Sequence, residues 1–92
     1  MALKVYLSGH LKSFSGGELE VPMDGNFACV ADALDSLWKI HPALRDRVLN
    51  EQGEIRQHVN IFTGSDDVKH LKGLATKLNS DELHIFNAVS GG

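Results

Sequence analysis

The amino-acid sequence predicts an α+β fold, in which a mixed sheet packs across one main helix. Apolar residues alternate with polar ones near both ends of the chain and once in between, which is the pattern of half-buried strands. One longer stretch carries apolar residues at helical spacing instead. The resulting order is strand, strand, helix, strand, short elements and strand. These elements form one sheet only if the first and last strands pair centrally as parallel neighbours.

The N-terminal part predicts a β-hairpin. Its first strand is Leu3–Leu7, which alternates apolar and polar residues. A turn at Ser15–Gly17 leads to a second strand, Glu18–Pro22, in which we expect Leu19 and Val21 to face inward. The proline that closes this strand has no N–H to donate, so it should mark the strand's end or an unpaired edge.

The main helix is predicted between Asn26, its expected N-cap, and His41. The residue before a proline avoids the helical region, so the helix should end before Pro42. A second, shorter helical segment then covers 43–49. The apolar face of the main helix consists of Phe27, Val30, Ala31, Leu34, Leu37, Trp38 and His41.

Two more strands are predicted in the C-terminal half. His58–Phe62 turns two apolar residues inward, and the last strand lies within Asp81–Val89. The segment 63–80 between them carries turn signals and room for short elements only.

Three aromatic residues should point away from the core, because they alternate with the inward residues of the strands. These are Tyr6, Phe62 and Phe86. Several outward aromatic side chains on a small domain form an apolar patch, which is typical of a surface that binds a protein partner. The alternative is that the second helical segment covers some of them.

Composition excludes several classes of function. The 92 residues carry nine basic and twelve acidic side chains, a net charge of −3, which offers no basic field for nucleic acid or anionic lipid. No apolar run approaches the length of a membrane span. The N-terminus has no export signal, and a single cysteine, Cys29, fits a reducing compartment. We therefore expect one cytoplasmic domain spanning residues 1–92.

No enzyme or metal site is predicted. The five histidines show no metal-ligand spacing, and His41 on the helix face suits a structural or capping role. Cys29 is more typical of a small core residue than of a reactive thiol, and the acidic pair Asp66-Asp67 is typical of a solvated turn.

The C-terminal residues 88–92 are predicted to form a flexible extended tail that ends in two glycines. Five extended residues reach about 16–18 Å, which suffices to enter a narrow active site while the domain docks outside. Glycine suits such a passage, because it has no Cβ and tolerates any backbone angle. The terminal carboxylate, with a pKa near 3.5, is anionic and needs activation by another protein before it can react.

The sequence resembles the MoaD/ThiS family of ubiquitin-like sulfur carriers, and its MoaD-like and CysO-like branch in particular. The resemblance rests on "NAVSGG" preceded by "SDELHIF", and on the run "HVNIFTGSDDVKHLKGLATKL". It is strong over 59–92 and consistent over the rest of the chain. It implies a β-grasp fold with a four- to five-stranded sheet. The tail lacks the prolines often found there in MoaD proteins, so the resemblance does not select molybdopterin synthesis.

The resemblance also implies a mechanism. An E1-like adenylyltransferase would use ATP to adenylate the carboxylate of Gly92, and a persulfide sulfur would then displace AMP to leave a thiocarboxylate. Val89, Ser90 and Gly91 would thread the tail into the partner, and Phe86 would lie on the docking face. The partners implied are the E1-like enzyme, a persulfide-donating sulfurtransferase and a sulfur-accepting biosynthetic enzyme.

By this resemblance the chain is a protein co-substrate without a bound cofactor or metal, and not an enzyme. It could also be the small non-catalytic subunit of a molybdopterin synthase-like complex. Two alternatives stay open: a ubiquitin-like modifier that joins Gly92 to lysines, and a plain binding domain. The acceptor pathway is also open among molybdopterin, thiamin, cysteine, tRNA and secondary-metabolite synthesis.

Overall fold

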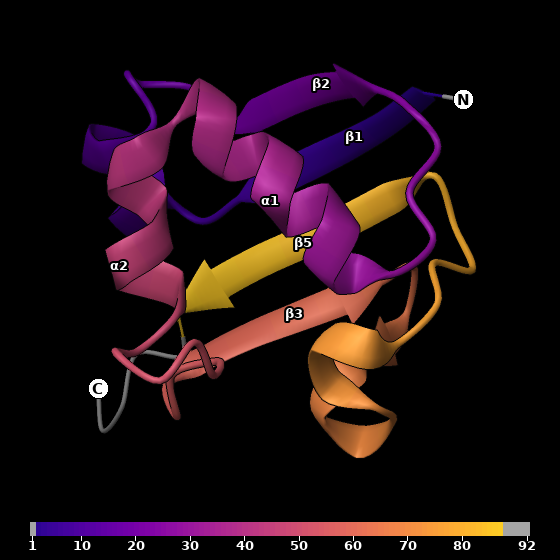
Figure 1. Ribbon diagram of the computed structural model, residues 1–92. Helices are drawn as coiled ribbons and strands as arrows, with labels where there is room; N and C mark the ends of the chain where they lie inside the picture. The colour runs from indigo at the N-terminus through magenta and orange to yellow at the C-terminus, as the bar shows by residue number, and fades with distance from the viewer. Residues whose placement is uncertain (1, 88–92) are drawn as a thin grey trace.

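Five strands form one mixed sheet in the order β2-β1-β5-β3-β4 (Figure 1). The computed structural model describes residues 2–87. The parallel pairing of the first and last strands at the centre of the sheet is confirmed, and the other pairs are antiparallel. The strands are β1 Ala2–Leu7, β2 Glu20–Asp24, β3 Val59–Thr63, β4 Asp66–Asp67 and β5 Glu82–Asn87.

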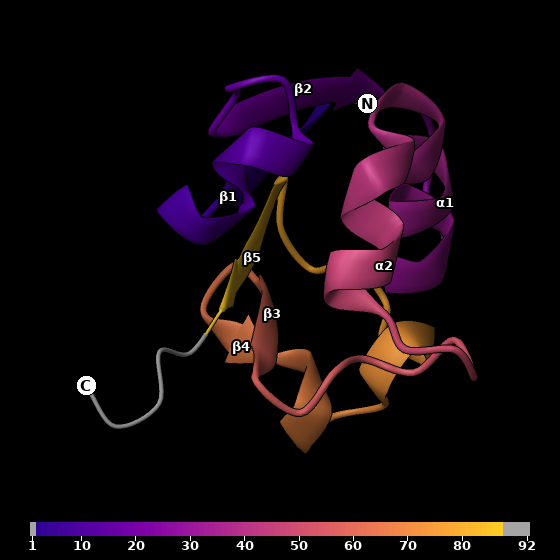
Figure 2. The ribbon, with the colours of Figure 1, turned by 90° about the vertical axis from the view of Figure 1, so that its left-hand side faces the viewer.

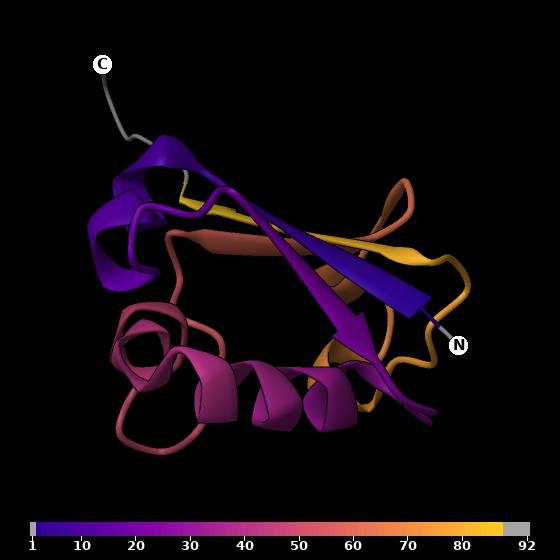
Figure 3. The same ribbon diagram turned by 90° about the horizontal axis from the view of Figure 1, so that it is seen from above.

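The α-helices lie on one face of this sheet, as the view from above shows (Figure 3). The main helix α1 spans Val30–Ile40, and α2 spans Arg45–Val48. Four short 3-10 helices complete the fold: η1 Gly9–Phe14, η2 Pro42–Leu44, η3 Val68–His70 and η4 Gly73–Ala75. The predicted α+β layers and the β-grasp arrangement are confirmed.

The core lies between the sheet and α1. Strand residues at alternate positions supply one side of it, as predicted: Leu3, Val5, Leu7, Val59, Ile61, Leu83 and Ile85 are all buried. The helix supplies Val30, Leu34 and Leu37 as predicted, and Ala33 is buried where Ala31 was expected, because the apolar face is turned slightly from the predicted one. Burial of such side chains stabilises the fold by roughly 1.5–3 kcal/mol each before the entropy cost of ordering them.

The second strand begins two residues later than predicted. Leu19 was expected to face inward but is 42% exposed, whereas Val21 faces the core as predicted, together with Met23. The Ser15 hydroxyl bonds the carbonyls of Lys12 and Glu18, which holds the turn closed as far as Glu18. The prediction that odd-numbered residues of this strand face inward was right, but the loop before the strand is longer than its turn signals indicated. The proline is at an edge, as expected, because β2 has only β1 as a neighbour.

The predicted N-cap, Asn26, is wrong. The helix begins at Val30, with Cys29 as its N-cap and no side-chain cap bond. The Phe27 ring packs over Gly25, where an added Cβ would lie 2.9 Å from the ring, so this segment turns before the helix can start. The N–H of Val30 donates instead to the carbonyl of Thr76 (2.9 Å).

The sequence also did not indicate η1, whose Leu11 is fully buried. The second helical segment is confirmed, although its first turn is the 3-10 helix η2 with Pro42 at its start. Among residues 2–87, no helix combines the length and apolar character that crossing a bilayer requires.

Candidate functional site

The outer face of the sheet carries an aromatic cluster formed by Tyr6, Phe62, His84 and Phe86, here called the aromatic face. These residues come from the three adjacent strands β1, β3 and β5. Strand register brings them together, since His84 lies opposite both Tyr6 and Phe62. Because successive side chains alternate between the two faces of a sheet, the burial of Leu83 and Ile85 places His84 and Phe86 outward.

The aromatic face consists of two stacked pairs. The rings of Tyr6 and His84 lie 4.7 Å apart between centroids, with planes 10° from parallel. The rings of Phe62 and Phe86 lie 5.4 Å apart at 18°. Such aromatic pairs contribute about 0.5–1.5 kcal/mol beyond the area they bury. The pairs therefore hold the rings in place on an otherwise open surface.

The aromatic face is accessible on the described part of the chain. Phe86 is 37% exposed, and Tyr6 and Phe62 are half-buried. The alternative that the second helical segment covers them is wrong, because α2 lies on the opposite face, where its Val48 enters the core (Figure 3). The structure thus brings the three predicted aromatic residues together.

Sequence reasoning missed His84 as a member of this site. Its signal was its position two residues before Phe86, which places both side chains on one face of the strand. Its Nε2 lies 3.1 Å from a carboxylate oxygen of Glu82, and Lys4 pairs with Glu20 at 3.9 Å on the same face. Exposed pairs of this kind stabilise little, so their main effect is a charged border beside an apolar centre.

The root of the tail lies directly beside the aromatic face. Asn87, the last described residue, follows Phe86 and pairs with Val59 of β3. Its N–H donates to the hydroxyl of Ser8 (3.3 Å), which fixes the end of the strand. The other predicted site residues, Val89, Ser90, Gly91 and Gly92, lie outside the described residues.

The remaining candidates for chemistry have structural roles. His41 caps the end of α1, and its N–H donates to the carbonyl of Leu37 (2.9 Å). Asp66 and Asp67 form the short strand β4 and not the solvated turn that we expected, and the Asp67 carboxylate caps η3 by accepting from the N–H of Lys69 (2.9 Å). Cys29 was expected to be a core residue, but it is only half-buried. No cluster of histidine, cysteine or acidic residues suited to a metal ion occurs between residues 2 and 87.

Comparison with known proteins yields full-length matches. No family model matches the chain. It is 42% identical over 74 residues, 80% of each chain, to small archaeal modifier protein 1 of Haloferax volcanii. A crystal structure of that protein superimposes with a TM-score of 0.82 over all of both chains, at 33% identity.

Two further matches cover nearly the whole of this chain. A proposed sulfur carrier of Archaeoglobus fulgidus is 31% identical over 93 residues, the whole of both chains. The BexX/CysO complex of Amycolatopsis orientalis contains a chain with a TM-score of 0.84 at 26% identity, covering 98% of this chain and 99% of that one. Sulfur carriers and modifiers therefore share this fold over the length of the described domain.

Proposed function

This chain belongs to the MoaD/ThiS-like family of ubiquitin-like sulfur carriers and small archaeal modifiers, and we propose that it carries sulfur as a thiocarboxylate on Gly92. The observation that carries the proposal is the continuity of β5 with the tail. One strand places Phe86 on the aromatic face and then leads, through Asn87, into the residues that end in Gly91 and Gly92.

The proposed chemistry starts from an unreactive anion. Attack of the Gly92 carboxylate on ATP, catalysed by an E1-like enzyme, gives an acyl adenylate and pyrophosphate. A persulfide sulfur of a sulfurtransferase attacks the acyl carbon and displaces AMP, which leaves an acyl disulfide. A thiol then cleaves its S–S bond and releases the thiocarboxylate. Thiolate character makes sulfur a strong nucleophile in both steps.

The chain itself supplies a surface that the partner recognises and a C-terminal carboxylate that reacts. We therefore propose that it is a protein co-substrate and not an enzyme. The aromatic face docks the partner, while Val89, Ser90 and Gly91 pass through its entrance. Glycine leaves no side chain to obstruct the reacting carbon. ATP binds to the activating enzyme and not to this chain. We further propose that the domain spans the chain up to the tail at 88–92, and that it works in the cytoplasm with protein partners only.

A second candidate is a ubiquitin-like modifier. The 42% identity to small archaeal modifier protein 1 favours it. Activation would be the same, but a lysine amine would attack the acyl carbon of the Gly92 adenylate, displace AMP and form an isopeptide bond. The structure of the aromatic face serves either route, since both require the same activating partner.

Intact-mass spectrometry separates the two routes. The chain is incubated with the E1-like enzyme of the same organism, ATP and a sulfur donor, and compared with a reaction without ATP. A mass gain matching one oxygen-to-sulfur exchange, absent from a variant that lacks Gly92, supports the carrier. High-mass conjugates that resist thiols support the modifier. An unchanged mass with active enzyme would refute both.

A further inference from the structure

A hollow of about 320 Å³ lies at the end of the domain from which the tail departs. It is open to solvent and bordered by η1, α2, the loop before β3 and the last residue of β5. Seen from that end, η1 and α2 lie to either side of β5 (Figure 2). Asn87 contributes both to the hollow and to the root of the tail. The aromatic face is on the outer side of the same strand.

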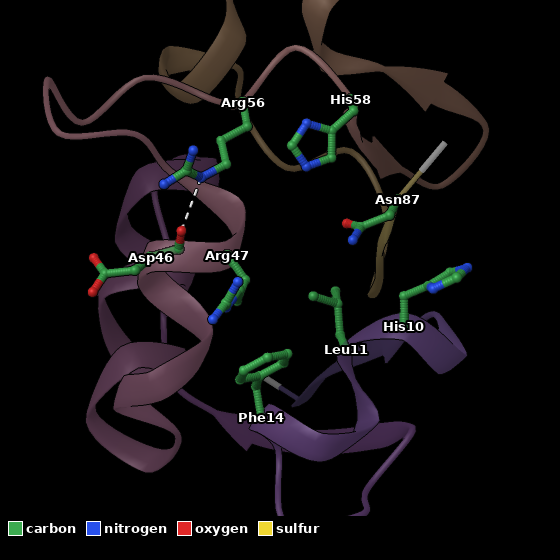
Figure 4. A pocket seen from close by; sticks show the side chains of 8 residues that line it. All are labelled: His10, Leu11, Phe14, Asp46, Arg47, Arg56, His58 and Asn87. Carbon is green, nitrogen blue, oxygen red and sulfur yellow. Dashed lines mark hydrogen bonds between the residues drawn. The ribbon is translucent and has the colours of Figure 1, made fainter. Parts of the chain in front are cut away.

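The hollow is cationic, although the chain as a whole carries a net charge of −3. Arg47 and Arg56 line it, together with His10 and His58. Both arginines keep a permanent positive charge, because the guanidinium is not deprotonated in proteins. The single acidic residue that lines it, Asp46, turns its carboxylate away from the hollow (Figure 4).

The two arginines have no ionic partner within residues 2–87. The Asp46 carboxylate pairs with Arg45 instead, at 3.0 Å. The Nε of Arg56 donates to the backbone carbonyl of Asp46 (2.8 Å), which orients the side chain but leaves its charge unbalanced. The guanidinium of Arg47 lies 4.3 Å from the ring centre of Phe14. Arg47 and Arg56 therefore line a hollow in which neither pairs with a described carboxylate.

Asn87 adds an unused polar group. Its Oδ1 is buried and has no hydrogen-bond partner among the described residues. Figure 4 shows the side chains of Asn87 and His58 directed into the hollow. A half-turn of the amide exchanges its oxygen and its NH₂ group, which gives the hollow a further donor. Buried polar groups in proteins are almost always bonded, so this one indicates a missing partner.

We propose that the hollow receives a carboxylate side chain of the E1-like protein that takes up the C-terminal tail. Arginine presents a planar fork of N–H donors that matches a carboxylate, and charge-assisted bonds of this kind are among the strongest. A protein that docks on the aromatic face and takes up the residues directly after Asn87 comes close to this hollow, because Asn87 lines it. The inference rests on the proposed function, since it assumes a partner that grips the tail.

Binding of the E1-like enzyme of the same organism to matched charge variants tests the proposal. Arg47 and Lys39 are both exposed cations in the last turn of a helix, so Arg47→Glu and Lys39→Glu change the net charge equally. We expect Arg47→Glu to raise Kd about tenfold at low salt and Lys39→Glu to raise it far less. Arg47→Lys should lie between wild type and Arg47→Glu, because it keeps the charge and loses the fork. Melting curves confirm that each variant is folded.

The failures of the two proposals are distinguishable. If the wild type forms the thiocarboxylate but the two charge reversals bind equally, the hollow proposal is overturned and the carrier function stands. If the wild type is never activated yet Arg47→Glu alone binds more weakly, the hollow proposal stands and the carrier function fails.

Two other occupants are tested on the free protein through the side-chain NMR signals of Arg47 and Arg56, with Arg45 as reference. A difference between the full chain with its free terminal carboxylate and the same chain with an amidated C-terminus would assign the hollow to the chain's own terminal carboxylate and overturn the proposal. A saturable shift with sodium phosphate, absent with chloride at equal ionic strength, would assign it to a small anion and overturn it too. Unchanged signals in both cases support the partner carboxylate.

Discussion

Replacing Phe86 with alanine should weaken binding to the activating partner while the domain stays folded. The side chain is 37% exposed, so roughly a third of its surface is still available for a partner to cover. A phenylalanine buries about 150–250 Å² when fully covered, which leaves on the order of 55–90 Å² here. At about 25 cal/mol per Å² this corresponds to roughly 1–2 kcal/mol, or a 5- to 30-fold rise in Kd.

The stability cost of the same change should be of similar size and is measured separately. Phe86 loses its stacking on Phe62, an interaction of about 0.5–1.5 kcal/mol, so Tm should fall by several degrees. Isothermal titration with the E1-like enzyme, at a temperature where both proteins are fully folded, isolates the binding term. Leu71→Ala is the matched control, because Leu71 is 53% exposed and lies outside the aromatic face.

If Phe86→Ala and Leu71→Ala both bind the enzyme as tightly as the wild type, Phe86 is an exposed side chain without a docking role. If both variants lose affinity to the same extent, the loss reflects general surface hydrophobicity and also contradicts the docking role. Only a loss confined to Phe86, with Tm still well above the assay temperature, supports the docking role of the aromatic face.

Three further changes separate folding from function. Deleting Gly92 should abolish thiocarboxylate formation in the intact-mass assay and leave Tm unchanged, because the buried core of the described chain ends at Ile85; a fall in Tm would contradict this. Ile85→Ala, at a fully buried position of the central strand, should lower the free energy of unfolding in urea by about 2–5 kcal/mol, and a loss below 1 kcal/mol would show that the core refills the cavity. Thr63→Val should lower the free energy of unfolding by about 1–3 kcal/mol in the same measurement. The buried Thr63 hydroxyl donates to the side-chain oxygen of Asn79 (3.0 Å) and accepts from its N–H (3.2 Å). An unchanged stability would mean that water replaces the hydroxyl.

Alternation along the strands was the most informative sequence signal. It predicted which residues of β1, β3 and β5 enter the core, and therefore which aromatic residues lie on the other face. The alternation remains informative even where a strand boundary is predicted wrongly. Strand β2 begins two residues later than predicted, yet Val21 still faces inward, and Met23 is buried where Leu19 was expected to be. The central parallel pair was predicted from the element order, because pairing the first and last strands joins the N-terminal hairpin and the C-terminal strands in one sheet.

Sequence signals failed for features that are determined by contacts between residues far apart in the chain or by packing. Asn26 is a good N-cap by type, but the packing of Phe27 on Gly25 delays the helix to Val30. The cationic hollow has no sequence signature at all. Arg47 and Arg56 are ordinary exposed or half-exposed cations in the sequence, and only the folding of η1 and α2 beside the end of β5 gathers them around Asn87.

The end of β5 links the two surfaces through adjacent residues. Phe86 points to the aromatic face and Asn87 lines the hollow, because successive side chains of a strand alternate in direction. A partner that holds the tail therefore meets an apolar contact and a charged one within one residue of each other. Apolar burial mainly supplies affinity, whereas complementary charge mainly speeds association and aligns the two proteins. The contribution of Arg47 should accordingly weaken as salt rises, while that of Phe86 should persist.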